Sequence, residues 1–222
     1  MALTNENQNV KQNFITLAGP ASAELLEKKS RFIGYAAPVT DEAAALAFLQ
    51  EIRSRHRDAT HNCYAYQAGE NDQFQRSSDD GEPSGTAGRP ILEVIRGRGL
   101  KNTAVVVTRY FGGILLGTGG LVRAYSAAAK AALAAAGLVS CEPAALYALA
   151  VDYASWQRLE SFLQNSGCEQ KNVSFSDRVD VQFAAPLAVR EGLPQGLAEL
   201  LGQEPHLLLL DEDAWLQKPF TE

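Results

Sequence analysis

Residues 141–222 carry the feature that most restricts how this chain can fold, a fixed order of strand and helix patterns. Its strand patterns alternate or run apolar, and its helical patterns repeat apolar residues every three to four positions. The segments, in order, are strand 146–153, helix 155–167, strand 168–175, strand 179–183, helix 187–201 and a buried strand 206–210. Ser155 is expected to cap the first helix, and Gly192 and Pro194 to split the second.

This β-α-β-β-α-β order predicts a ferredoxin-like domain. Residues 14–140 also mix both kinds of element, so the fold class is α+β. The expected elements are a hairpin 25–39, a helix capped by Thr40, a strand 61–67, a polar loop 69–88, a short helix 90–95, a central strand 103–110, a glycine-rich loop 112–120 and an alanine-rich helix 121–136. Because Gly137 can end that helix and Pro143 follows, we expect domains at 14–140 and 141–222, after a disordered leader over 1–13.

Composition narrows the class of protein. Hydrophobic residues make up 46% and charged residues 21% of the 222, which suits globular domains with real cores. No apolar run reaches the roughly 18 residues that a membrane span needs, and the polar start does not resemble a secretory signal. The three cysteines, at positions 63, 141 and 168, are widely spaced and form neither a disulfide framework nor a CxxC metal site. We therefore expect a cytoplasmic protein that does not associate with membranes.

The charge is distributed unevenly. Residues 1–140 hold 15 basic and 13 acidic side chains, whereas residues 141–222 hold 5 and 13. Within the first part, residues 84–140 hold seven basic side chains against Glu93 alone. This block could form a basic surface for an anionic partner such as RNA, or it could be solubility charge spread over several faces.

Glycine marks the region of greatest interest, because ten of the eighteen glycines fall between Gly81 and Gly120. The loop 112–120 follows a strand and precedes a helix, an arrangement that presents backbone N–H groups to an anion. Arg109 and Arg123 flank this loop and could contact a phosphate, or the glycines could serve only to turn the chain tightly. Either arginine could instead form a structural ion pair with the segment 79–82. The nucleotide-binding fingerprints fail, since Gly112-x4-Gly117-Thr118 lacks the P-loop lysine.

Acidic and nucleophilic residues offer weaker signals. Asp79, Asp80 and Glu82 could bind a hard cation, but their spacing matches no EF-hand loop and a polar turn uses the same residues. His61 and Cys63 share one face of a strand and could form a nucleophile pair, although a satisfied strand histidine beside a small apolar cysteine explains them as well. We therefore predict no catalytic residue, no metal and no cofactor.

Long motifs in this region resemble the IMPACT/YigZ family. The segments that carry the resemblance are Lys28-Lys29-Ser30-Arg31-Phe32-Ile33, the His61 strand, Ser78-Asp79-Asp80-Gly81-Glu82-Pro83-x-Gly85-Thr86-Ala87-Gly88-x-Pro90, and Arg109-Tyr110-Phe111-Gly112-Gly113-x-x-Leu116-Gly117-x-Gly119-Gly120-Leu121-Val122-x-Ala124-Tyr125. The resemblance implies a first domain with the fold of elongation factor G domain IV and of a small-subunit ribosomal protein. It implies a second domain similar to elongation factor G domain V.

The resemblance also implies a role in translation. Eukaryotic members regulate translation during amino-acid starvation by competing for an activator of an initiation-factor kinase, through an extra N-terminal domain that we expect this chain to lack. Our first hypothesis is a non-catalytic regulator that binds the ribosome, RNA or a translation protein; an enzyme using the segments 79–82 and 112–120 for phosphate or metal chemistry and a protein-binding adaptor are the alternatives. The candidate binding residues are Arg31, His61, Asp79, Asp80, Glu82, Gly85, Thr86, Arg109, Tyr110, Gly112, Gly113, Gly117, Gly119, Gly120 and Arg123.

Overall fold

The structure, a computed structural model, describes residues 12–69 and 71–220. The chain divides into two compact units, one built on residues 14–139 with 219–220 and the other on residues 140–218. Most of the leader predicted over 1–13 lies outside the described residues. None of the helices in the described ranges combines the length and the apolar character needed to cross a membrane.

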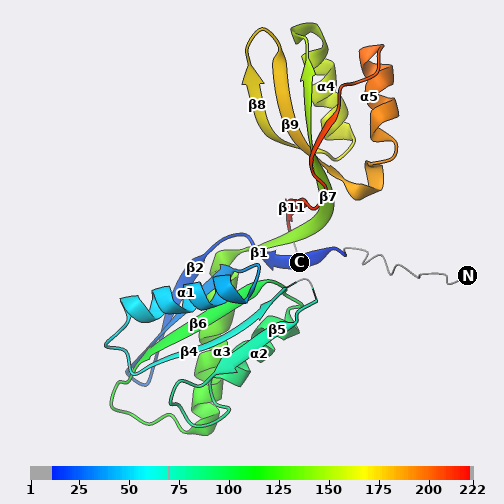
Figure 1. Cartoon of the computed structure of the whole chain (residues 1–222). Helices are drawn as coiled ribbons and strands as arrows, with labels where there is room; N and C mark the ends of the chain where they lie inside the picture. Colours follow the sequence, from blue (N-terminus) through cyan, green and yellow to red (C-terminus); the bar gives the residue numbers. More distant parts are fainter. Residues whose placement is uncertain (1–11, 70, 221–222) are drawn as a thin grey trace, which may run out of the picture. The chain divides into compact units, whose positions relative to one another are not determined.

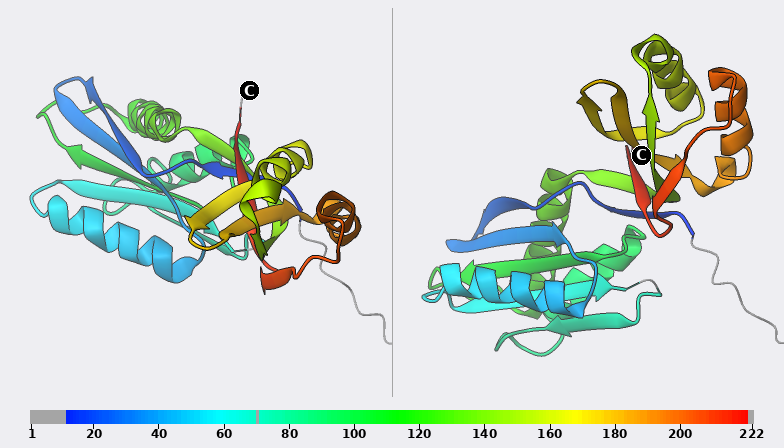
Figure 2. Two further views of the ribbon diagram at one scale, coloured as in Figure 1. Left: turned by 90° about the horizontal axis from the view of Figure 1, so that it is seen from above. Right: turned by 45° about the horizontal axis from the view of Figure 1, so that its top comes forward.

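A five-stranded antiparallel sheet forms the centre of the first unit. Its strand order is β2-β3-β6-β4-β5, and the strands are β2 (Ala21–Glu27), β3 (Ser30–Pro38), β6 (Thr103–Tyr110), β4 (His61–Ala68) and β5 (Phe74–Ser78). The apolar strand β6 lies between β3 and β4, which confirms its predicted central position. Figures 1 and 2 show helix α1 (Glu42–Arg55) on one face of this sheet and helices α2 (Gly88–Gly97) and α3 (Thr118–Ala136) on the other.

Each face of the sheet packs against the apolar stripe of its helices. Ala45, Leu49 and Ile52 of α1 cluster with Tyr66 and Val106 of the sheet. On the opposite face α3 approaches closely because its stripe is mostly alanine. A Cβ on Gly34 of β3 would lie only 2.5 Å from the carbonyl oxygen of Ala128. The alanine-rich helix therefore allows the close packing that its composition predicts.

Several predicted boundaries of the first unit are wrong. Asp41, not Thr40, caps α1, since its carboxylate accepts a hydrogen bond from the N–H of Ala44 (2.8 Å). The segment 69–88 is not one long loop, because it contains β5, which pairs with the sheet through β4 alone and is mostly exposed. An edge strand of this kind shows no apolar alternation. The strand β1 (Phe14–Leu17) was also not expected.

The second unit has the predicted ferredoxin-like order. Its elements are β7 (Leu138–Val151), α4 (Tyr153–Asn165), β8 (Glu169–Phe175), β9 (Val179–Pro186), a short 3-10 turn (Leu187–Val189), α5 (Leu193–Leu201), β10 (Leu208–Asp211) and β11 (Trp215–Pro219). The strands order as β10-β7-β9-β8 with antiparallel neighbours. The core gathers apolar residues of β7, β9, α4 and α5, among them Leu149, Phe183, Leu159 and Leu197.

Three predictions about the second unit need correction. Asp152 rather than Ser155 caps α4, accepting from the N–H of Ser155 (2.7 Å). Strand β10 is exposed rather than buried, because it pairs with the sheet through β7 alone. The chain then continues into β11, which also pairs with β7 and was not predicted.

Candidate functional site

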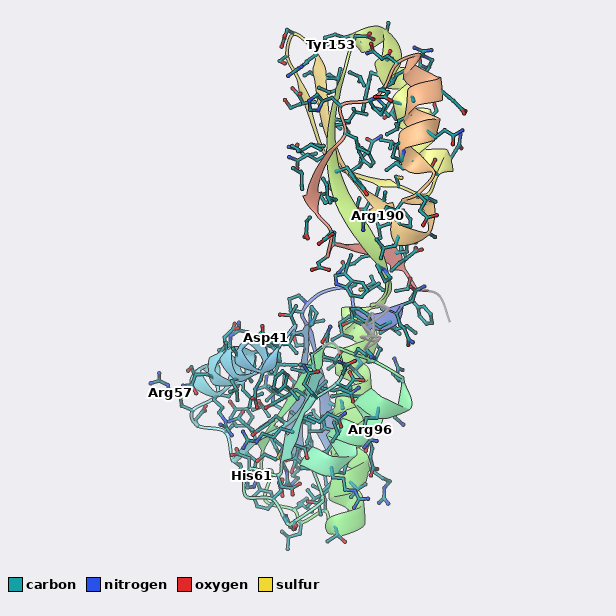
Figure 3. All side chains as sticks on the ribbon, turned by 45° about the vertical axis from the view of Figure 1, so that its right-hand side comes forward. Asp41, Arg57, His61, Arg96, Tyr153 and Arg190 are labelled. Carbon is teal, nitrogen blue, oxygen red and sulfur yellow. The ribbon has the colours of Figure 1, made fainter. Side chains whose placement is uncertain are left out.

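One edge of the first sheet brings both glycine-rich segments together. The strand register places His61 opposite Arg109 and Arg31 opposite Tyr110, and Ser78 opposite Tyr64. The segment 79–87, the loop 111–117 and the hairpin turn at Lys28–Lys29 therefore all leave the sheet at this edge, which we call the motif edge. Helices α2 and α3 both begin here, and His61, labelled in Figure 3, marks the position.

Glu82 is the centre of a buried polar network at the motif edge. Its Oε1 accepts from the Arg109 guanidinium (2.6 Å) and from the Tyr125 hydroxyl (2.8 Å). The Nε2 of His61 lies 3.8 Å from the same oxygen. Both Glu82 and Arg109 are buried, so each charge depends on the other for compensation.

Arg109 belongs to this network and forms the structural ion pair with the segment 79–82 that is the alternative to anion binding. Its second terminal nitrogen is 3.3 Å from the Oγ of Ser30, and its guanidinium lies 5.3 Å from the ring centroids of both Phe32 and Phe111. Only 5% of the residue is exposed. Arg109 is therefore held inside the protein, whereas Arg123 is exposed on the first turns of α3.

Asp79 organises the first glycine segment from within. Its Oδ1 accepts from the N–H groups of Ala87 and Gly88 (2.9 Å each), and its Oδ2 accepts from Gly85 (2.8 Å). Burial alone would raise the pKa of this carboxyl, but the three N–H bonds outweigh it and hold the pKa below the ordinary value. Gly88 must lack a side chain, because a Cβ there would lie 2.6 Å from the backbone of Ser78.

The neighbouring side chains of this segment are also occupied inside the protein. Asp80 accepts from the N–H of Asn62 (2.7 Å) and pairs with Arg53 (3.2 Å), while its carbonyl accepts from Nδ1 of His61 (2.8 Å). Thr86 donates to the carbonyl of Pro83 (2.7 Å). Within residues 12–69 and 71–220, no three His, Cys, Asp or Glu side chains are grouped to hold a metal ion.

Cys63 and His61 do not form a nucleophile pair. The Cys63 thiol donates to the carbonyl of Asp79 (2.9 Å) and contacts the Tyr125 hydroxyl (3.3 Å), whereas His61 turns to Asp80. Burial raises the pKa of the Cys63 thiol to about 12. It therefore remains protonated at neutral pH and serves as a small core residue.

The second glycine segment differs in exposing its side chains. The N–H of Gly112 donates to Ser30 Oγ (3.2 Å), and a Cβ on Gly112 would lie 2.0 Å from the carbonyl oxygen of Lys29. Gly113 and Gly117 have φ values of +80° and +72°. Between and beside them Phe111, Ile114 and Leu115 are exposed, Leu115 by 83%. The remaining two predicted glycines, Gly119 and Gly120, lie in the first turn of α3.

Tyr110 and Arg31 form a separate group at the neighbouring strand ends. The Tyr110 hydroxyl lies 2.8 Å from Nδ1 of His56 and donates to Asp58 (3.2 Å). The guanidinium of Arg31 lies 5.7 Å from the Tyr110 ring centroid and pairs with Glu24 (2.8 Å). These contacts leave Arg31 half-exposed at the surface.

Exposed cations gather on the helices that start at the motif edge. Arg89, Arg96 and Arg98 belong to α2 or its C-cap, and Arg123 and Lys130 belong to α3. Their one acidic neighbour from the 84–140 block, Glu93, pairs with Arg89 (3.0 Å). A shallow groove of about 390 Å³ lies between α2 and α3, lined among others by Arg98, Val122 and Lys130. Arg123 lines a separate groove together with Lys28 and Glu27. We call the other four cations, Arg89, Arg96, Arg98 and Lys130, the α2–α3 basic surface; Arg96 is labelled in Figure 3.

The candidate residues were incomplete, because Tyr125, Ser30 and Cys63 were not among them. Tyr125 and Ser30 lie within the motifs that carry the family resemblance, and membership of those motifs could have marked them as candidate site residues. Cys63 shares a strand face with His61, yet its contact with Tyr125 joins residues 62 positions apart. Pattern analysis cannot supply a contact of that range.

Comparisons with known proteins agree with this arrangement. The Impact N-terminal domain family matches residues 28–133, and a domain family of unknown function, DUF1949, matches residues 149–203. The IMPACT family member YvyE of Bacillus subtilis (strain 168) is 42% identical over 170 residues, which cover 77% of this chain and 78% of that protein. The IMPACT family member YigZ of Escherichia coli (strain K12) is 36% identical over 203 residues, 90% of this chain and 100% of that protein.

A solved structure of similar sequence has a similar fold. The crystal structure of a hypothetical protein with 35% sequence identity covers 91% of this chain and 99% of its own, with a TM-score of 0.60. The relatives thus span both units, and the family motifs lie at the motif edge. The chain therefore belongs to the IMPACT family.

Proposed function

We propose that this protein is a non-catalytic regulator of translation that binds RNA of the translation apparatus through the α2–α3 basic surface. Family membership suggests the process, and the placement of charge suggests the partner. The observation that carries the proposal is the presence of four exposed cations, Arg89, Arg96, Arg98 and Lys130, on two adjacent helices. Nucleic-acid affinity depends largely on such surfaces, because each phosphate contact releases a bound counterion.

The internal contacts of the acidic segment favour binding over catalysis. Asp79, Asp80 and Glu82 each accept hydrogen bonds or ion pairs from groups of the same chain. A phosphate- or metal-dependent enzyme would need these oxygens for its ligand, so binding would have to break contacts that stabilise the fold. The exposed cations of α2 and α3 need no such rearrangement. The enzyme alternative therefore has no specific observation in its favour.

Sedimentation tests the proposal directly. The protein should sediment with ribosomal particles at low salt and be released as the salt concentration rises. In a triple variant, Arg96→Glu, Arg98→Glu and Lys130→Glu, affinity for RNA should fall. The slope of log affinity against log salt should flatten by roughly 0.7 to 0.9 for each lost phosphate contact.

A matched control comes from the second unit. Lys171, Arg178 and Arg190 are also surface cations, and their reversal to Glu changes the net charge by the same amount. The control should retain affinity and slope. Equal losses in both triple variants would show a non-specific charge effect and contradict an RNA site on α2 and α3.

A further inference from the structure

The ring of Phe111 is exposed at the motif edge, and the proposed binding by the α2–α3 basic surface gives it no role. Phe111 directly follows β6, and 45% of the residue is exposed. An aromatic ring open to solvent on a monomer surface is a common contact point for a partner. Its neighbours Ile114 and Leu115 are exposed as well, so the whole loop presents apolar groups.

The backbone under this ring is held from two sides. The N–H of Phe111 donates to Thr60 Oγ1 (3.1 Å), and the N–H of Gly112 donates to Ser30 Oγ (3.2 Å). The close approach of Gly112 to Lys29 leaves no room for the backbone to move toward the hairpin. A partner that contacts this ring would therefore lose little entropy by ordering it.

One side of the ring is already backed by a cation. The Arg109 guanidinium lies 5.3 Å from the Phe111 centroid and is itself buried between Phe111 and Phe32. The ion pair with Glu82 fixes this guanidinium in place. The solvent-exposed part of the Phe111 ring is thus left for a further planar group to stack on.

The charges around the loop select the kind of planar group. Lys28 and Lys29 are exposed in the hairpin turn against which Gly112 packs, and Arg123 is exposed on α3. Together with the α2–α3 basic surface they favour a phosphate-bearing ligand. Nucleobases supply a planar group between phosphates, and base stacking on aromatic side chains is the usual way to bind unpaired strands.

We propose that Phe111 is a stacking platform for an unpaired nucleobase, so that the RNA bound by this protein is single-stranded where it crosses the motif edge. This inference rests on the proposed function and specifies its substrate class. Paired bases inside a helix are stacked on each other and cannot reach such a ring.

Fluorescence anisotropy with two probes tests the platform: a labelled single-stranded 12-nucleotide oligouridylate and a labelled 12-base-pair RNA duplex. Phe111→Ala should weaken binding of the single strand by about 5- to 150-fold, as expected for one lost stacking contact. Its affinity for the duplex should stay unchanged, and Phe111→Tyr should retain both. Phe74→Ala, the same change at an exposed phenylalanine at the opposite end of β5 from the motif edge, should alter neither affinity.

The outcomes separate the platform from the basic surface. Equal losses for single strand and duplex in Phe111→Ala, or no loss for either, would overturn the platform. If Phe111→Ala has no effect while the triple charge reversal abolishes binding, the proposed function survives and the platform does not. If wild-type protein binds neither probe and no ribosomal particle, both proposals are wrong. Thermal melting should show that Phe111→Ala remains folded.

Discussion

The two segments of the motif edge are both rich in glycine, but their side chains differ in burial. In the segment 79–88 Glu82 and Thr86 are buried, and Asp79 alone accepts three backbone N–H bonds. In the loop 111–117 the backbone is pinned by its neighbours while the side chains point outward. Glycine thus serves one segment by allowing it to close on itself and the other by allowing close approach to the hairpin. The first segment is a structural support, and the second exposes the side chains that we propose contact a partner.

The largest expected effect is a loss of stability when the segment 79–88 loses its buried carboxylate. Glu82→Ala leaves the buried guanidinium of Arg109 without its carboxylate and should destabilise the protein by about 3–5 kcal/mol. Urea denaturation measures this difference. The matched control is Glu93→Ala, which removes an exposed ion pair with Arg89 and should cost at most about 1 kcal/mol. If both variants lose a similarly small free energy of unfolding, the segment 79–88 does not stabilise the fold through Glu82.

A smaller effect is expected where the second segment meets the hairpin. Gly112→Ala places a Cβ 2.0 Å from the Lys29 carbonyl oxygen, so the backbone must shift, at a cost of about 1–3 kcal/mol. The shift should also displace Phe111 and weaken single-strand RNA binding. Gly97→Ala, where a Cβ meets nothing within 4 Å, serves as the control and should leave stability equal or slightly higher. Unchanged stability of Gly112→Ala would mean that the loop is not pinned.

The smallest effect depends on pH and on Asp79. Because its pKa is lowered in the folded state, its contribution is complete above the ordinary Asp pKa of about 3.9 and is lost as pH falls through the folded value. Asp79→Asn replaces one accepting oxygen by an NH2 group and should cost about 1 kcal/mol at pH 7. Unfolding curves at pH 7 and pH 3 should show the gap between variant and wild type narrowing at the lower pH. A gap that widens on acidification would contradict a charged, hydrogen-bonded Asp79.

Much of the fold followed from local patterns. The ferredoxin-like order, the central strand β6 and the alanine-rich helix α3 were predictable because each depends on periodicity or composition within one segment. The missed elements β1, β5 and β11 are short or mostly exposed strands. Each of these strands forms by pairing with another strand, and the local pattern of residues does not indicate which strand that is.

The candidate site shows the same division. The sequence by itself determined where the glycines and charges cluster, because clustering is visible without coordinates, and it predicted a site in these two segments. Only the tertiary structure decided that Arg109 turns inward to Glu82, 27 positions away, while Phe111 two residues later faces solvent. Arg109 lies within β6, where Glu82 and Phe32 from other segments contact it, whereas Phe111 lies beyond the end of that strand and remains 45% exposed. These covering residues are distant in the chain, so a local pattern does not reveal them. For this reason Arg109, a residue that the sequence offered for ligand binding, is part of the support, whereas Phe111 is the exposed residue.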